Sequence, residues 1–301
     1  MKTHKFAIVF AGLLWGTMGY FVRHMGAHGY SSQDVVIVRS GVASLFFALL
    51  ILIQNRKLFL VHIKDIWCFL GSGIVSMLFF TYCYYSAISL TSMSTAAILL
   101  YTSPAFVMLI SLFLFHEKMR KNKLVALAVV IVGCALSSGL GSDSVISAKG
   151  LLFGLGSGIG YALYSIFATL AMQRGYDSRT VSFYSTLFAT IGACILWGGG
   201  KPMGMMIASE TDLLWCASVG FITCFLPYLF YTCGLSGVEP GAASIMVAVE
   251  PCMATVVGMV AFGEMLTVTT GAGVLLVVAA IVILNFPERR KRTVEKTIVK
   301  N

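Results

Sequence analysis

Charged side chains inside long apolar stretches are the residues of this sequence best placed to do chemistry. Glu250 lies near the middle of the stretch 239–262, directly before Pro251, and Arg39 lies in the stretch 33–53. A charge at the centre of a bilayer costs roughly 2.5–3.5 kcal/mol, so one that is retained is a functional candidate. Because proline removes a helical N–H and loosens the backbone beside it, we expect Glu250 to bind a cation, a proton or an amine.

Both charges also have structural interpretations. Glu250 could be a carboxyl that is neutral or hydrogen-bonded to a neighbouring helix. Arg39 lies close to the start of its stretch and could extend to the membrane interface. It could also pair with a carboxylate such as Glu250, or contact an anionic group of a ligand. The sequence leaves these alternatives open.

Aromatic residues are frequent in the same stretches. Five of them occupy positions inside the stretches or at matching places in the two halves of the chain, and we expect these to line a cavity: Trp15, Tyr84, Tyr101, Tyr161 and Tyr231. Aromatic faces beside a carboxylate favour an amine-bearing or amphipathic ligand. An interfacial aromatic belt and helix packing are the alternatives for any single one.

Prolines and glutamates mark the ends and interiors of several stretches. We expect hinges at the three prolines within apolar stretches, with a static kink as the alternative: Pro104, Pro227 and Pro251.

Glu117 and Glu264 follow the stretches 91–115 and 239–262. Capping or anchoring of a helix end is the simpler interpretation of these two carboxylates. The alternative interpretation is that the two carboxylates act as gates on opposite sides of a membrane.

The composition indicates which class of fold positions these residues. The chain has 301 residues, of which 58% are hydrophobic and 11% charged, against about 25% charged in a soluble domain. A bilayer core about 30 Å thick needs roughly 20 apolar residues per helix. We therefore predict an all-α integral membrane protein with ten transmembrane helices, near 6–22, 33–53, 66–88, 91–115, 123–140, 150–171, 179–198, 212–233, 239–262 and 266–286.

Lysine and arginine residues predict the orientation, because they concentrate on the cytoplasmic side. If the N-terminus lies inside, the outer loops hold only Arg23, Lys149 and Lys201. Both termini are then cytoplasmic, and the first span is retained rather than cleaved. The basic tail 287–301 is expected to be attracted to anionic lipid. The predicted location is the cell membrane (the plasma or inner membrane).

The two halves of the chain resemble each other. Residues 98–118 align without gaps on 245–265, and this register places Pro104 on Pro251 and Glu117 on Glu264. Five helices per half is an odd number, so the second copy, 150–286, is inverted relative to the first, 6–140. Inverted repeats recur in secondary transporters, in which two near-equivalent halves exchange conformations.

These residues resemble a known family. Leu14-Trp15-Gly16, Arg39, Ser103-Pro104 with Glu117, Glu250-Pro251 and Gly263-Glu264 are similar, in order and spacing, to EamA-type members of the drug/metabolite transporter superfamily. Two departures stand out: His116 stands where the family usually has glycine, and Tyr161-Ala162 where a second Trp-Gly is expected. The resemblance implies a ten-helix exporter or facilitator of small metabolites.

We therefore expect a secondary active transporter that exports a small metabolite, such as an amino acid or amine, by alternating access with proton coupling. The predicted substrate-binding residues are Trp15, Arg39, Tyr84, Tyr101, Ser103, Tyr161, Tyr231 and Glu250. The expected partners are a small-molecule substrate and the lipid bilayer, and a homodimer is left open. No cofactor is expected.

Other classes of protein fit the sequence less well. The net charge of +9 forms no basic stripe, which argues against nucleic-acid binding. No histidine lies at membrane depth, and no CxxC, HExxH or GxSxG motif occurs, so neither an intramembrane enzyme nor a metal site is indicated. A channel-like permease lacks visible rings of polar groups or a filter loop. A membrane receptor that moves no solute is not excluded.

Overall fold

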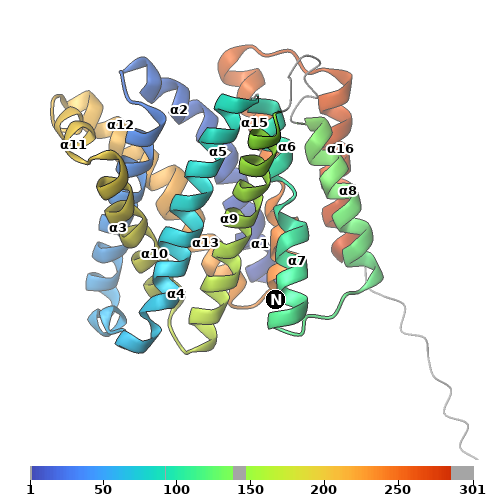
Figure 1. Cartoon of the computed structure of the whole chain (residues 1–301), viewed down its shortest axis with the longest axis horizontal. Helices are drawn as coiled ribbons and strands as arrows, with labels where there is room; N and C mark the ends of the chain where they lie inside the picture. Colours follow the sequence, from blue (N-terminus) through green and yellow to red (C-terminus); the bar gives the residue numbers. More distant parts are fainter. Residues whose placement is uncertain (1, 92, 138–146, 286–301) are drawn as a thin grey trace, which may run out of the picture.

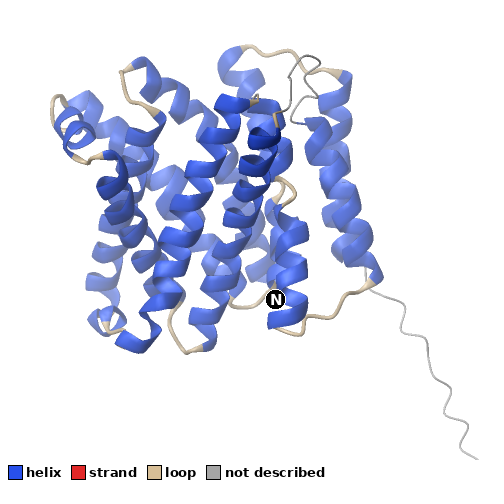
Figure 2. Ribbon diagram, viewed as in Figure 1, coloured by secondary structure: helices blue, strands red, loops and turns tan. Residues whose placement is uncertain are grey.

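The computed structural model describes residues 2–91, 93–137 and 147–285. Within these ranges every regular element is a helix, and Figure 2 shows one bundle without a strand. The predicted basic tail 287–301 lies outside the described residues. The all-α membrane fold expected from composition is confirmed.

Nine described segments are long and apolar enough to cross a membrane: Lys2–Ala27, Ser32–Gln54, Ile63–Leu90, Thr95–Leu114, Ala148–Gln173, Ser178–Trp197, Glu210–Leu235, Pro240–Phe262 and Val268–Asn285. The predicted fifth span corresponds to α8 (Lys121–Ser137), which has 17 residues. Residues 138–140 of the predicted span 123–140 lie outside the described residues. Ten spans therefore remain a prediction.

Most of these segments are composed of several shorter helices. The first half contains α1 (Lys2–Gly16), α2 (Met18–Ala27), α3 (Ser32–Gln54), two 3₁₀ turns (Arg56–Phe59 and Ile63–Asp65), α4 (Ile66–Leu70), the π-helical η3 (Gly71–Leu78), α5 (Phe79–Leu90), α6 (Met93–Leu100), α7 (Ser103–Leu114) and α8. The second half contains α9 (Ala148–Gln173), α10 (Ser178–Trp197), α11 (Gly200–Met206), α12 (Glu210–Gly220), the π-helical η4 (Phe221–Phe225), α13 (Leu226–Leu235), α14 (Pro240–Val247), α15 (Glu250–Phe262) and α16 (Val268–Asn285).

Two spans are broken in the middle. α6 ends at Leu100 before α7 begins at Ser103, and α14 ends at Val247 before α15 begins at Glu250. Both breaks lie inside single candidate spans, Thr95–Leu114 and Pro240–Phe262, which match the spans predicted near 91–115 and 239–262. Pro104 and Pro251 lie in the first turn of α7 and α15, where a missing N–H has no cost. The prolines thus start new helices instead of kinking old ones.

The helix bounds of the two halves follow the register of the sequence repeat. α6 and α14 begin at Met93 and Pro240, and α7 and α15 begin at Ser103 and Glu250, each pair 147 residues apart. His116 and Gly263, also 147 residues apart, both have left-handed backbones with φ of 52° and 65°. Because glycine adopts this conformation without strain, the geometry explains why the family usually has glycine where this chain has His116.

The start of α1 and the end of α16 lie at the same end of the bundle, the lower end in Figure 1, referred to below as the terminal end. Lys5 Nζ donates a hydrogen bond to Asn285 Oδ1 at 2.7 Å. The expectation that both termini share one side is consistent with this contact.

α8 and α16 pack against each other at one edge of the bundle (Figure 1). Gly133 of α8 and Gly273 of α16 face each other so closely that a Cβ at Gly273 would lie 2.6 Å from the Gly133 carbonyl oxygen. The two backbones are therefore in direct contact, which is how small residues stabilise helix pairs in lipid.

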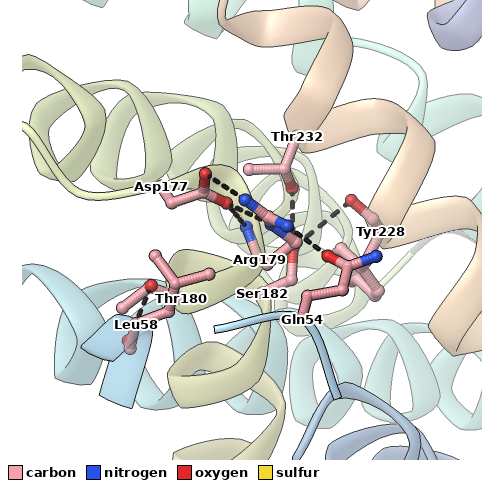
Figure 3. Close-up of polar contacts among 8 residues, drawn as sticks. All are labelled: Gln54, Leu58, Asp177, Arg179, Thr180, Ser182, Tyr228 and Thr232. Atoms are coloured by element: carbon pink, nitrogen blue, oxygen red, sulfur yellow. Dashed lines mark hydrogen bonds and ion pairs between the residues drawn. The ribbon is translucent and has the colours of Figure 1, made fainter. Parts of the chain in front are cut away.

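A polar cluster ties α3, α10 and α13 together at the terminal end (Figure 3). Asp177 is the N-cap of α10, and its carboxylate accepts two hydrogen bonds of 2.7 Å from the Arg179 guanidinium. Arg179 also contacts the Gln54 side chain. One turn further, Ser182 donates to Thr232 Oγ1 at 3.1 Å. This ion pair and the cap fix the start of α10.

Replacing Asp177 tests this cluster. The hydrogen bonds from Arg179 lower the pKa of the Asp177 carboxyl. A lowered pKa contributes stability above the unfolded value of about 3.9 and loses it as pH falls through the folded value. Asp177→Ala should destabilise the chain by about 1 kcal/mol at pH 7. Thermal unfolding in nanodiscs, followed by tryptophan fluorescence, measures the effect.

Asp177→Asn is the matched control, since it keeps a capping oxygen and removes the charge. Its melting temperature should fall between those of the wild type and Asp177→Ala at pH 7 and approach the wild type as pH drops below about 4. Equal melting temperatures for the wild type and both variants at pH 7 would contradict the assignment.

Candidate functional site

The break between α14 and α15 places Glu250 in the centre of the bundle. Glu250 is the first residue of α15 and is half-buried. Glu250 is the eleventh residue of the span Pro240–Phe262 and lies beside the backbone that Pro251 was predicted to loosen. The positive end of the α15 dipole favours a negative charge at this position. Tyr161 of α9 donates a hydrogen bond to Glu250 Oε2 at 3.3 Å.

Two glycines of α1 allow it to pack directly on this break. A Cβ at Gly12 would lie 2.5 Å from the Val247 carbonyl oxygen, and one at Gly16 would lie 2.5 Å from the Glu250 carbonyl oxygen. A side chain larger than the hydrogen of glycine therefore does not fit at position 12 or 16. The close approach brings Trp15, between the two glycines, into the centre of the bundle.

Trp15 forms the middle of an aromatic cluster. Its ring centroid lies 5.2 Å from that of Tyr228, 5.4 Å from Tyr231 and 6.2 Å from Tyr161. The Tyr231 hydroxyl is 2.7 Å from Ser165 Oγ. These side chains form part of the wall of a small cavity lined by Trp15, Ser76, Met77, Phe80, Tyr161, Tyr164, Ser165, Tyr228 and Tyr231.

Arg39 lines a second small cavity that adjoins the first. The two share Met77, Phe80 and Tyr228, and the second is completed by Val36, Arg39, Ser40, Leu78, Thr81 and Ala189. An Arg39 Nη1–H points to Met18 Sδ at 3.2 Å. Among the described residues no carboxylate lies within 4.0 Å of its guanidinium. The ion pair with Glu250 considered from sequence is therefore not formed, and Arg39 is directed inward.

The other predicted residues lie around Glu250 or at the starts of helices. Tyr84 and Tyr101 lie close enough to Glu250 for their hydroxyls to interact electrostatically with its carboxylate. Ser103 is buried at the start of α7, the position in the first half that corresponds to Glu250. Pro227 lies in the first turn of α13, directly after the π-helical η4. Hinge motion at the prolines remains a prediction.

Comparison with known proteins identifies the family of this arrangement. The sequence profile of the EamA-like transporter family matches the chain twice, over residues 4–139 and 148–286. The chain belongs to the EamA-like transporter family. It is a multi-pass membrane transporter, as the resemblance predicted.

Two relatives of this EamA protein are similar over nearly their whole length. An uncharacterized transporter of Archaeoglobus fulgidus is 27% identical over 287 residues, covering 94% of this chain and 96% of the relative. The uncharacterized transporter YwfM of Bacillus subtilis is 20% identical, with 96% and 95% covered. A solved crystal structure with 15% identity superposes with a TM-score of 0.78 over 95% of this chain and 97% of that one. This likeness extends to the fold alone.

The EamA chain places its two predicted gate carboxylates in different surroundings. Glu117 follows α7 at the terminal end, where Lys123 Nζ lies 2.5 Å from its Oε1 and the Gly241 N–H donates to its Oε2 at 3.2 Å. Lys123 also lies 2.5 Å from Glu239 Oε2. The Glu117 and Lys123 side chains are only 4% and 7% exposed. We call Glu117, Lys123, Glu239 and Gly241 the clasp.

Glu264 follows α15 at the opposite end of the bundle (Figure 1). It pairs with Arg23 at 2.8 Å, and both side chains are more than half exposed. The Arg23 guanidinium also lies over the Phe262 ring. The two carboxylates therefore differ: one is buried between the halves and the other is near the surface.

Sequence reasoning missed several residues of this EamA protein. Tyr228 and Tyr164 line the central cavity, although nothing in the sequence distinguishes them from the other tyrosines. Lys123 and Glu239 stand at the first positions of the predicted spans 123–140 and 239–262 and were given no role, yet Lys123 is buried. A lysine two residues after Lys121, at the edge of an apolar stretch, was the available signal. Within the described ranges no group of His, Cys, Asp and Glu residues is arranged to hold a metal ion.

Proposed function

We propose that this EamA-family protein is a secondary active exporter of a small metabolite, such as an amino acid or amine, and works by alternating access. The observation that carries the proposal is a carboxylate at a helix break inside a membrane-spanning segment, next to an aromatic cavity. Broken helices at mid-membrane form the binding sites of many transporters. Trp15, Tyr161 and Glu250 are the residues proposed to contact the substrate first.

Alternating access is supported by the two ends of the bundle. The terminal end is held by the clasp, in which Glu117 and Lys123 are buried and which joins the first half to the start of α14. At the other end, the carboxylate at the corresponding position forms an exposed ion pair. An inverted repeat can exchange these two arrangements, so we propose that Glu117 and Glu264 act as gates that close in turn. The matching helix bounds of the two halves support this repeat.

Proton coupling is assigned to Glu250. Tyr161 on α9 donates a hydrogen bond to it. The other charged and titratable groups within electrostatic range are Arg39 on α3, Tyr84 on α5, Tyr101 before α7, Cys134 on α8 and Tyr228 on α13. A carboxylate at a helix break can exchange its proton for a cationic group of the substrate. Export, the cell membrane and cytoplasmic termini follow from the family resemblance and the basic residues.

An export experiment tests the function. Three cultures are grown side by side: cells that express the wild type, cells that express Glu250→Gln at the same membrane level, and cells that express neither. The metabolites in the three media are then compared. A solute enriched outside only with the wild type supports the exporter and the role of Glu250. If both proteins enrich the solute in the medium, the export proposal stands and Glu250 has a structural role. Enrichment by neither, together with no uptake of any solute by reconstituted protein, would favour the receptor alternative.

Flux measurements separate a carrier from a channel-like permease. Purified protein in liposomes should show saturable flux that is accelerated by substrate on the far side. Flux that rises linearly with concentration would favour the permease.

A further inference from the structure

We infer that the π-helical segments η3 and η4 are a matched pair of hinges between the two halves, and that η4 yields before η3. The inference rests on the proposed function in one respect, because it takes alternating access as the motion that the hinges serve. It adds which segments bend and which of them moves first. Two features carry it: the place of both segments in the repeat, and the difference between their contacts.

The two π-helices occupy the same place in the repeat. η3 and η4 end at Leu78 and Phe225, 147 residues apart, and α5 and α13 follow directly. Pro227 cannot donate a backbone hydrogen bond to the preceding turn, which accounts for the widened turn of η4. Phe80 stands at the corresponding place in the first half and keeps its N–H. Since π-helical turns inside α-helices are rare and frequent at functional sites, their recurrence without a shared proline indicates a shared role.

Each π-helix packs against the opposite half. η3 contacts α9 and α10 of the second half, and η4 contacts α3 and α1 of the first. The contacts are close. A Cβ at Gly73 of η3 would lie 2.6 Å from the Ser185 carbonyl oxygen, and one at Gly220, directly before η4, would lie 2.4 Å from Val42 Cβ. Any movement of one half against the other therefore has to shift these two segments.

The contacts of η3 are polar. Ser72 Oγ lies 2.5 Å from Ser185 Oγ on α10, and Ser76 donates a hydrogen bond of 2.7 Å to the Gly160 carbonyl on α9. Both η3 serines are buried. A buried hydrogen bond that breaks without water to replace it leaves its partners unpaired, which is costly. These two contacts therefore hold η3 on the second half.

The corresponding contacts of η4 are apolar. The repeat places Val219 at the position of Ser72 and Val38 at that of Ser185. Both valines belong to one buried apolar cluster, in which α3 packs against α12 and η4. Lipid tails are as apolar as these side chains, so no hydrophobic driving force holds such helices together in a bilayer. Two valines in contact can therefore slide without losing a directional bond.

The polar groups of η4 make local or weaker contacts. Thr223, at the position of Ser76, donates to the Val219 carbonyl of its own span at 2.6 Å. The Cys224 thiol interacts with the Arg39 guanidinium of α3, and a thiol is a weak hydrogen-bonding group. η3 is therefore held on the opposite half more firmly than η4, and η4 is the hinge that yields first.

Hydrogen–deuterium exchange of the full chain in nanodiscs, followed by mass spectrometry, tests this order without any solute. One hydrogen bond changes an opening equilibrium about 2- to 12-fold, so the amides of η4, corrected for intrinsic rates, should exchange at least about twofold faster than those of η3. Both segments should exchange faster than the middle of α10. A smaller or reversed difference, or exchange in either segment no faster than in α10, overturns the inference.

A serine variant shows whether the polar contacts set this order. Ser76→Ala removes the bond to the Gly160 carbonyl and should raise the exchange of η3 about 2- to 12-fold, with η4 unchanged. Ser157→Ala is the matched control. Ser157 is a buried serine of α9 whose hydroxyl donates to Gly154 of its own helix, so η3 should keep its wild-type rates. Unchanged η3 exchange in folded Ser76→Ala overturns the inference. If this variant does not fold, the wild-type comparison of η3 and η4 decides alone.

Liposome flux separates this inference from the proposed function. If the exchange follows the expected order but reconstituted protein moves no solute, the transporter proposal is contradicted and the hinge assignment stands. If solute is transported but η3 and η4 exchange at the same rate, the hinge order is wrong and the transporter proposal stands.

Discussion

Replacing Lys123 with methionine is expected to destabilise the folded chain by about 3–5 kcal/mol, which is the usual effect of removing one partner of a buried ion pair. The Glu117 side chain is 4% exposed and lies 2.5 Å from Lys123 Nζ. Without the ammonium group, this carboxylate stays buried with the Gly241 N–H as its remaining partner in the clasp. Thermal unfolding and the yield of monodisperse protein in detergent measure the loss.

Two further variants give this prediction its controls. Lys123→Met combined with Glu117→Gln removes the uncompensated charge and should recover a large part of the stability. Arg23→Met breaks the equivalent pair at the other end, where both side chains are more than half exposed, and should cost less than about 1 kcal/mol. If Lys123→Met is no worse than Arg23→Met, the clasp does not hold the two halves together.

Glu250→Gln is expected to reduce transport of the substrate found in the export experiment by at least about tenfold and to flatten its pH dependence. The amide keeps the size of the side chain and cannot take up a proton. Liposomes loaded with a pH-sensitive dye measure both solute flux and the accompanying proton flux, and we expect the proton signal to disappear.

Tyr161→Phe is the matched control for Glu250. It removes the hydrogen bond to Glu250 Oε2 and leaves the carboxylate able to titrate. The rate should fall while the pH dependence persists. A Glu250→Gln protein with wild-type rate and pH profile would show that this carboxylate is structural.

The sequence predicted the class of the protein better than its geometry. Apolar stretches of about 20 residues indicate membrane helices whatever their tertiary contacts, and the EamA resemblance led to the correct family. Pro104 and Pro251 were expected to kink or break their helices, but the positions of the breaks, residues 101–102 and 248–249, were not predicted. A proline is compatible with a kink or with a new helix, and the choice depends on which neighbour supports the freed backbone. Here α1 packs on the second break through Gly12 and Gly16.

The candidate site was predicted in part for a similar reason. Trp15, Tyr161, Tyr231 and Glu250 were selected because intramembrane polar and aromatic residues are visible in a sequence, and they do lie together. The clasp could not be foreseen, because Lys123 and Glu239 are 116 residues apart and each by itself resembles an ordinary loop charge. The burial of Lys123 results from how the halves pack, which no local pattern encodes.

The backbone contact between α8 and α16 has a consequence for how the chain is made. α8 has 17 residues, and the partner for its Gly133 is Gly273, far later in the chain. A ribosome that has completed α8 must synthesise the whole second half before α16 emerges. During that interval the Gly133 face of α8 has no α16 backbone to contact. The contact between α8 and α16 therefore forms only after most of the second half has been synthesised.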